Sequence, residues 1–362
     1  MIENNGQMSS NKYKLGQIEA SILDSFPDPI VIVDQNRNVL AANFPARELI
    51  GNDYLGLDLS MSIRDPNVLA SVSKTLESGQ DELIEVFFPV PFSRTFNLRV
   101  INLLPSSIHK AEAILIFQDI TATKRSEQMR VDFIANASHE LRSPLAALLG
   151  FIETLRGSAS DDREAQKKFL AIMQSEAERM TNLIDDLLSL SQVEFTEHLQ
   201  PIQDVEVNSI LNSAVDSLLG ESKKRRIKLD ISIDSDIRKI LGDENQLRQV
   251  IQNLLDNSLK YADQNSRIKV IAKNIDRVPQ SNVSGVSITI KDKSDGIEQN
   301  DLPRLTERFY RVDKGRSRSL GGTGLGLAIV KHIVTRHRGH LKIDSKFKEG
   351  TIVTVSLPSD KL

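Results

Sequence analysis

The chain contains no cysteine and no tryptophan, and only 4 of its 362 residues are tyrosine. Without cysteine, disulfides, thiolate metal sites and cysteine nucleophiles are excluded. No apolar run approaches the ~20 residues of a membrane-spanning helix, and the longest clean one is Ala113 to Phe117. The N-terminus lacks a signal-peptide pattern as well. We therefore expect a cytoplasmic protein without a transmembrane span, or one recruited peripherally to a membrane.

An excess of either charge is also missing. Lysine and arginine total 46, aspartate and glutamate total 49, and the formal net charge is −3. A dedicated nucleic-acid binder usually carries a basic excess, so no nucleic-acid partner is expected. The composition, 40% hydrophobic and 26% charged, is that of a globular protein, and a chain of this length has room for about two or three domains.

Periodicity divides the chain into segments with different patterns. Residues 1–17 are polar and predict a flexible N-terminus. Residues 18–121 alternate short strand patterns with turns, which indicates a small α+β domain on an antiparallel sheet. The strands expected there are Pro29 to Asp34, Val39 to Asn43, Glu82 to Phe88, Phe96 to Leu103 and Ala113 to Gln118.

Residues 122–197 have the period of helices, interrupted by a polar break at residues 157–163. Apolar residues recur every seven positions in two stripes: Ile134, Leu141, Leu148 and Leu155 with Leu145 and Ile152, then Leu170, Ala177 and Ile184 with Met173, Met180 and Leu187. Two helices alone bury too little apolar surface to be stable, so we expect a four-helix bundle formed by a homodimer. A coiled-coil spacer is the alternative reading of the same pattern.

Residues 205–362 mix both periods and predict an α/β sandwich with one sheet and a layer of helices. The elements expected there are helices near 207–219, at 244–261 and after Thr323, and strands at 227–233, 268–275, 286–291, 341–344 and 351–357. The whole chain is thus predicted to be a multidomain α+β protein.

The segment ASHELRSP, Ala137 to Pro144, interrupts the first helical stripe with polar residues. If Ile134 occupies heptad position a, His139 lies at the outer position f and Ser143 shares its exposed face. A neutral imidazole can act as a nucleophile when a carboxylate such as that of Glu140 accepts the proton of its other nitrogen. Ser143 could position a water for hydrolysis. A histidine that is merely an ordinary surface residue is the alternative.

Four segments of the C-terminal region carry groups suited to a nucleotide. Asn253 and Asn257 share a helix face, where amide oxygens suit Mg²⁺, and Lys260 and Tyr261 follow them. Asp292 follows a strand, where a carboxylate can accept from an exocyclic amine. A basic loop runs from Arg308 to Arg318, and GGTGLGLAIV opens a helix whose N-terminal amides favour an anion. This is neither a P-loop nor a Rossmann fingerprint.

In this order the segments resemble the H, N, G1, F and G2 boxes of bacterial two-component sensor histidine kinases, over residues 123–357. The stretches FIANASHELRSPLAALLGFIETL, LPRLTERFYRVDK and GGTGLGLAIVKHI are most similar to phosphate-regulon (PhoR-type) kinases. Residues 18–121 resemble a PAS sensor domain through DPIVIVDQNRNVLAAN and IFQDIT. The resemblance implies a GHKL-type ATPase domain at 205–362 and a dimerisation and phosphotransfer domain at 122–197.

The resemblance also assigns roles. His139 is implied as the phosphate acceptor, Glu140 as its acid/base partner, and Asn257 with Asn253 as the ligands of Mg²⁺. The implied ATP contacts are Lys260 to the phosphates, Tyr261 and Asp292 to adenine, Gly296 as a loop glycine, Tyr310 and Arg311 near the γ-phosphate, and Gly322, Thr323, Gly324, Leu325 and Gly326 as the lid hinge. The implied partner is the receiver domain of a response regulator, which takes the phosphoryl group on an aspartate.

Two departures from the family pattern stand out. Ser294 replaces the usual first glycine of the DxGxGI box, and serine at a position requiring positive φ would weaken nucleotide binding several-fold. Ser143 replaces the usual threonine or asparagine and leaves phosphatase activity open. A non-catalytic dimeric PAS scaffold with impaired ATP binding is therefore the rival hypothesis. A zinc site at His332, His337 and His340 is disfavoured, because their spacing does not share one helix face.

Overall fold

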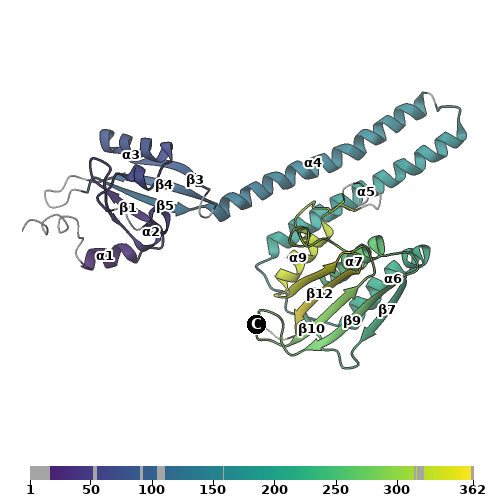
Figure 1. Ribbon diagram of the computed structural model, residues 1–362. Coiled ribbons are helices and arrows are strands. Elements are labelled where there is room, and N and C mark those ends of the chain that lie inside the picture. Colours follow the sequence, from purple (N-terminus) through teal and green to yellow (C-terminus); the bar gives the residue numbers. More distant parts are fainter. Residues whose placement is uncertain are drawn as a thin grey trace, which may run out of the picture. The chain divides into compact units, whose positions relative to one another are not determined.

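The computed structural model describes residues 17–51, 55–89, 93–103, 111–157, 159–313, 315 and 322–359. The predicted flexible N-terminus lies outside these residues except for residue 17. The chain forms two compact units, Met1–Asp132 and Phe133–Leu362, each described by itself (Figure 1). Within the described ranges, no helix is both long and apolar enough to cross a membrane.

The N-terminal unit is built on an antiparallel five-stranded sheet in the order β2-β1-β5-β4-β3. Its strands are β1 (Ile30–Val33), β2 (Val39–Ala42), β3 (Glu82–Phe88), β4 (Arg94–Asn102) and β5 (Ala113–Asp119). The helices are α1 (Gln17–Asp24), α2 (Phe44–Ile50), η1 (Leu59–Met61) and α3 (Pro66–Ser78). Buried residues of α2, η1 and α3 join those of the sheet in one core. The predicted antiparallel sheet is confirmed.

Alternation along the strands explains which face of this sheet is covered. In β4, Phe96, Leu98 and Val100 are buried while their neighbours are partly or fully exposed, as the two-residue period of a strand requires. Asn43 joins α2 to the sheet: its Oδ1 accepts from the amide of Ala46 at 3.0 Å and from that of Ile30 at 2.8 Å.

A helical hairpin follows, made of α4 (Thr121–Arg156) and α5 (Arg163–Thr196). Asp162 caps α5 by accepting from the amides of Glu164 and Ala165. The helix α4 is continuous through the buried Pro144, so the lost backbone donor does not end it. The two helices and the polar break are where the heptad pattern predicts them.

The predicted apolar stripes are only partly buried within one chain. Ile134 is 57% exposed and Leu145 49% exposed on α4. Exposed apolar side chains of the hairpin also include Leu149, Ile152, Leu170, Ile184 and Leu188. The residues of α5 that are fully buried are instead Leu183, Leu190 and Val193, which belong to the core of the ATPase-like region. The helix α5 therefore has two apolar faces, and the heptad series found only one of them.

The C-terminal region is an α/β sandwich, as predicted. Its five-stranded sheet has the order β11-β12-β10-β9-β7, in which only the β7–β9 pair is parallel. The strands are β7 (Lys228–Ile233), β9 (Arg267–Ile275), β10 (Gly285–Lys291), β11 (His340–Lys346) and β12 (Gly350–Pro358). The helices α6 (Val207–Arg225), α7 (Glu244–Tyr261) and α9 (Gly326–Arg336) cover one face of this sheet (Figure 1).

Smaller elements complete this region. The short strands β6 (Gln203–Val205) and β8 (Ile240–Gly242) pair with each other, and the 3-10 turn η2 (Leu302–Arg304) precedes the basic loop. His337 lies in the core against β8, where a Cβ on Gly242 would come within 2.8 Å of its ring. Glycine at this position thus lets the imidazole approach the start of α7.

Candidate functional site

A cavity of about 520 Å³ opens between α7, the loop after β10 and the loop before α9. Its volume is in the range of small-molecule sites. It is lined by nearly all the residues predicted for the nucleotide: Asn253, Asn257, Lys260, Tyr261, Asp292, Gly296, Tyr310, Arg311, Gly322, Thr323, Gly324 and Gly326. Leu325 is buried beside it instead. Segments far apart in sequence are thus brought to one cavity.

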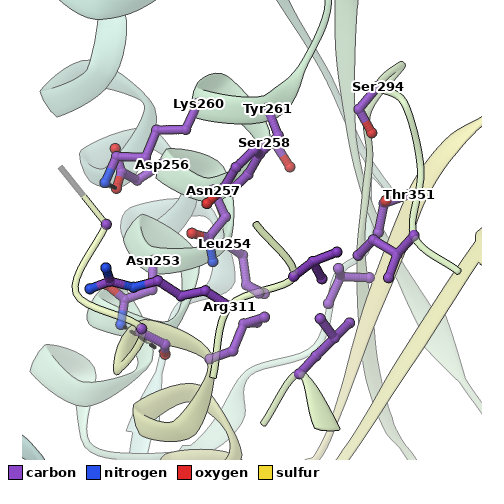
Figure 2. Close-up of a pocket in the computed structure, with 18 of the residues that line it drawn as sticks. Asn253, Leu254, Asp256, Asn257, Ser258, Lys260, Tyr261, Ser294, Arg311 and Thr351 are labelled. Carbon is purple, nitrogen blue, oxygen red and sulfur yellow. Dashed lines mark hydrogen bonds and ion pairs between the residues drawn. The ribbon is translucent and has the colours of Figure 1, made fainter. Parts of the chain in front are cut away.

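One wall of the cavity is the polar face of α7. The opposite face of this helix buries Leu247, Ile251 and Leu255 in the core, which turns Asn253 and Asn257 to the cavity (Figure 2). The Nδ2 atom of Asn253 donates to the carbonyl of Gly326 at 3.4 Å, so its amide links α7 to α9.

The end of α7 carries the predicted lysine. The Nζ atom of Lys260 lies 2.6 Å from a carboxylate oxygen of Asp256, so Lys260 forms an ion pair with the residue one helical turn before it. Arg225 of α6 fixes this end, because its Nη1 atom donates to the carbonyls of Leu259 and Lys260 at 3.0 and 2.9 Å. Arg225 thus ties the end of α6 to the end of α7.

Asp292 lies directly after β10 and is only 7% exposed. Its carboxylate accepts from the hydroxyl of Ser258 and from the amide of Thr351, both at 3.2 Å. Burial raises the pKa of this carboxyl above its usual value, and hydrogen bonds from Ser294, Thr351 and Ser258 offset part of the rise. Because a carboxylate oxygen accepts more than one hydrogen bond, Asp292 can also accept from a ligand amine.

The loop after Asp292 needs glycine at Gly296 but not at the preceding serine. Gly296 has φ +69°, and a Cβ there would lie 2.1 Å from the carbonyl oxygen of Lys346. Ser294 is not among the described non-glycine residues with positive φ, because it forms an antiparallel bridge with Ala262. The backbone strain expected of a serine with positive φ at this position is therefore absent.

The glycine-rich loop is held against the preceding basic segment. Gly324 has φ +77°, and a Cβ there would lie 2.9 Å from the Cα of Phe309. The amide of Phe309 donates to the carbonyl of Gly324 at 2.9 Å. The helix α9 begins at Gly326, at the cavity, so its N-terminal amides and dipole favour an anion there. Gly321 lies outside the described residues.

Tyr310 and Arg311 line the cavity but bond to carboxylates of the chain itself. The hydroxyl of Tyr310 donates to Asp301 at 2.6 Å, and this hydrogen bond raises the pKa of the tyrosine. The Arg311 side chain is 7% exposed, and its Nη2 atom lies 3.5 Å from Oε2 of Glu140 on α4. Both side chains are thus engaged with carboxylates in this structure.

The helix α5 supplies part of the cavity wall, which the sequence did not predict. Asn182, Asp185 and Asp186 line it. The carboxylate of Asp186 accepts from the hydroxyl of Thr323 at 2.6 Å. Burial raises the pKa of Asp186, and the hydrogen bond from Thr323 offsets part of that rise. The sequence could not predict this contact, because acidic residues on the polar face of an amphipathic helix are usually solvent-exposed.

The predicted acceptor lies on α4. His139 and Ser143 are both exposed, as predicted from the heptad register. Glu140 is half-buried, and its Oε2 atom lies 3.0 Å from Nη2 of Arg179 on α5 as well as near Arg311. His139 does not line the cavity, so a phosphoryl transfer between them requires movement.

The three C-terminal histidines do not form a metal site. Both ring nitrogens of His337 are engaged: Nδ1 with the carbonyl of Ile333 at 2.7 Å, and Nε2 with the amide of Asp243 at 2.9 Å. His332 contacts Glu197 at 2.7 Å. Within the described ranges, no group of three or more histidine or acidic residues is arranged to hold a metal.

Comparison with known proteins gives matches to two family models. Residues 242–361 match the histidine kinase-, DNA gyrase B- and HSP90-like ATPase family, and residues 129–196 match the His Kinase A (phospho-acceptor) domain. The solved complex of histidine kinase ThkA with response regulator protein TrrA superposes with a TM-score of 0.51 at 19% identity, covering 94% of this chain and 98% of that one. This likeness shows a shared fold.

Curated relatives match over most of the chain. The phosphate regulon sensor protein PhoR of Pseudomonas aeruginosa is 33% identical over 90% of this chain and 71% of its own length. The sensor-like histidine kinase SenX3 of Mycolicibacterium smegmatis is 30% identical over 95% and 86%. The sensor histidine kinase WalK of Bacillus subtilis is 29% identical over 94% of this chain but only 55% of its own length. The chain thus spans little more than half of WalK.

Proposed function

The chain belongs to the two-component sensor histidine kinases, and we propose that it phosphorylates His139 from ATP and passes the phosphoryl group to an aspartate of a response regulator. It is an ATP-dependent protein-histidine kinase. The observation that carries the residue assignment is the cavity of about 520 Å³ into which four separate segments place the predicted nucleotide residues. The exposed His139 is the matching acceptor.

Asp292 and Tyr261 form the proposed adenine end of the cavity. Asp292 would accept from the exocyclic amine of adenine, since Ser258, Thr351 and Ser294 do not fill the roughly four lone-pair sites of a carboxylate. Tyr261 lies at the end of α7 beside the cavity (Figure 2), where its ring can stack on a purine.

Asn253, Asn257 and Lys260 form the proposed phosphate end, together with the amides at the start of α9. The donor set fits a magnesium ion, because amide oxygens are hard ligands and Asn253 uses its nitrogen, not its oxygen, to bond Gly326. Asn257 and Asn253 would hold the ion, which when bound neutralises phosphate charge. Lys260 would exchange Asp256 for a phosphate.

Transfer to His139 follows from the chemistry of imidazole. One neutral ring nitrogen attacks the γ-phosphorus, an N–P bond forms, and the P–O bond to ADP breaks. The other ring nitrogen gives its proton to Glu140. Because Glu140 contacts Arg179 and Arg311 and His139 lies outside the cavity, the ATPase domain must first move relative to α4. The segment from Thr196 to Asp204, which joins α5 to the ATPase domain, is the proposed hinge.

A second copy of the chain is the proposed partner of the hairpin. Ile134, Leu145 and Ile152 of α4 and Leu170 and Ile184 of α5 are exposed, which leaves an apolar face that a second hairpin would cover in a four-helix bundle. The match of residues 129–196 to a phospho-acceptor domain supports this reading.

The N-terminal unit is proposed to be a PAS-like sensor at residues 18–121, followed by the phosphotransfer domain at 122–197 and the ATPase at 205–362. The sheet order β2-β1-β5-β4-β3 supports this assignment. The relative named as a phosphate regulon sensor supports a role in phosphate-type signalling, with Ser143 placing a water when the kinase acts as a phosphatase. We place the protein at the cytoplasmic side, free or recruited peripherally.

Labelling with γ-phosphate-labelled ATP and Mg²⁺ tests the proposal. We expect label that is acid-labile, alkali-stable and absent in His139→Gln. His340→Gln is the matched control, because His340 is partly exposed on β11 and does not line the cavity, so it should leave the label unchanged. An unlabelled wild type at millimolar ATP would instead support the non-catalytic scaffold.

A further inference from the structure

Ser294 lies at the proposed adenine end of the cavity. It is 8% exposed and follows Asp292 by two residues. Its backbone bridges to Ala262, just beyond α7, and it lines the cavity opposite Tyr261 and Asn257 (Figure 2). The bridge holds the side chain at the cavity wall with ordinary backbone geometry, so this serine is built into the site.

The hydroxyl of Ser294 is part of the hydrogen-bond network of Asp292. Its Oγ accepts from the amide of Gly296 at 3.4 Å, and the interaction of its side chain with the Asp292 carboxylate lowers the pKa of that carboxyl. A hydroxyl has one donor and two acceptor sites, and the donor rotates freely. The hydroxyl of Ser294 can therefore turn from Asp292 to another acceptor at this end of the cavity.

The other donors beside Asp292 are committed. The hydroxyl of Ser258 and the amide of Thr351 both bond to the carboxylate, and the hydroxyl of Thr351 lies 2.9 Å from that of Ser345. Adenine presents an exocyclic amine beside the ring nitrogen N1, which is an acceptor. A carboxylate satisfies the amine but cannot satisfy N1, so a second group must donate there.

We propose that Ser294 is a second nucleobase-reading residue, whose hydroxyl donates to the N1 atom of the adenine held by Asp292. The inference rests on the proposed function and names how the same site recognises its base. The amine of the bound adenine gives Asp292 a new donor, which releases the hydroxyl of Ser294 to turn to N1. The serine therefore strengthens ATP binding, the opposite of the loss expected from a strained backbone.

Atom deletion on both sides of this hydrogen bond tests the proposal. We would measure binding of ATP and of 1-deaza-ATP, in which a C–H replaces N1, to the full-length wild type, Ser294→Ala and Ser294→Gly by titration calorimetry. For the wild type, 1-deaza-ATP should bind about five-fold more weakly than ATP, as expected for one neutral hydrogen bond. Both variants should bind ATP about five-fold more weakly and bind 1-deaza-ATP as the wild type does.

Two controls separate this role from a structural one. 7-Deaza-ATP changes a ring nitrogen away from the amine edge, so the variants should weaken its binding as much as that of ATP. The pH dependence of ATP binding should also change. Ser294→Ala removes a donor that lowers the Asp292 pKa, so ATP affinity should be lost at a higher pH than in the wild type.

Several results would overturn the proposal. Equal weakening of ATP and 1-deaza-ATP by the variants would show that Ser294 only supports the loop. Tighter ATP binding by Ser294→Gly would show that the side chain obstructs the cavity. A wild type that binds both nucleotides equally would exclude donation to N1 without any substitution. A wild type that binds no ATP would contradict the nucleotide site itself, which is a distinct failure.

Discussion

The Nη2 atom of Arg311 lies 3.5 Å from the Oε2 atom of Glu140, and the same oxygen lies 3.0 Å from Nη2 of Arg179. The three side chains come from the loop before α9, from α4 and from α5. All three are largely shielded from solvent, at 7% to 20% exposed side-chain surface. Two guanidinium groups thus hold the carboxylate that is proposed to accept the proton of His139, and a residue proposed to contact the γ-phosphate is held with it.

Replacing Glu140 by glutamine should therefore slow autophosphorylation without weakening ATP binding. The amide keeps the shape but cannot accept the proton of the imidazole, and the loss of a general base costs about 10²-fold or more in rate. The measurement is the initial rate of labelling at saturating ATP, with ATP affinity measured separately. Arg179→Met is the matched control, because it removes the closer cation but leaves the carboxylate, and its rate should not fall. Wild-type labelling by Glu140→Gln would exclude the acid/base role.

Asp186→Asn should tighten ATP binding. Asp186 brings a carboxylate of α5 to the cavity and bonds Thr323 of the glycine-rich loop at 2.6 Å. A negative charge in the cavity wall repels the phosphates of a bound nucleotide, so its removal should raise affinity about five-fold, or about 1 kcal/mol. Calorimetry on the full chain measures this. Asp216→Asn, on the exposed side of α6, is the control that should change nothing.

The pH dependence of ATP binding gives a second check on Asp186. Burial raises the pKa of its carboxyl above 3.8, so Asp186 in the cavity wall binds a proton at higher pH than an exposed aspartate does. As pH falls from neutrality toward the raised pKa, Asp186 loses its negative charge, so the difference in ATP affinity between the wild type and Asp186→Asn should narrow. Unchanged affinity in Asp186→Asn would show that α5 leaves the cavity before ATP enters.

The sequence predicted the segments of this site better than their contacts. The bounds of α7 are those expected, Glu244–Tyr261, because its apolar period and its cap at Asp243 are local. Several motif residues meet at one cavity because they lie on α7, directly after β10 or at the start of α9. By contrast, nothing local to α5 indicates that Asp186 faces the glycine-rich loop.

Errors in the sequence reading have the same origin. The seven-residue series omitted Leu183 and Leu190, which face the ATPase core, because a heptad describes one face and α5 uses two. The backbone geometry of Ser294 depends on its bridge to Ala262, a contact between segments on different elements. Local pattern gives element type and face, whereas the partner of each face is a property of the tertiary structure.

His337 should make the C-terminal region less stable in acid. Burial lowers the pKa of this imidazole below 6.5. Its Nε2 atom accepts from the amide of Asp243 and therefore carries no proton in the folded chain. Below about pH 6.5 the unfolded chain binds a proton that the folded chain excludes, so this contribution is complete above that pH and is lost as pH falls. Each further pH unit should cost up to about 1.4 kcal/mol.

Urea unfolding of the full chain at several pH values, followed by circular dichroism, checks this. The informative quantity is the difference in unfolding free energy between wild type and His337→Gln, because the other titrating groups cancel. His198→Gln, at an exposed site, should keep the wild-type pH dependence. Parallel curves for the wild type and His337→Gln would show that the buried imidazole does not resist protonation.

Leu145→Glu should convert the proposed dimer into monomers. Leu145 is 49% exposed on α4, and the proposed bundle would bury it against the second hairpin. A carboxylate without a partner in an apolar interface is strongly unfavourable, so the dimer dissociation constant should rise about 100-fold or more. Ile231→Glu is the matched control, because Ile231 is a similarly exposed apolar residue on β7, at 39%, outside the hairpin. Sedimentation velocity at micromolar protein should show monomers for Leu145→Glu and dimers for Ile231→Glu. Dimers in both would mean that another surface joins the chains, since the charged side chain could not remain in the bundle as described.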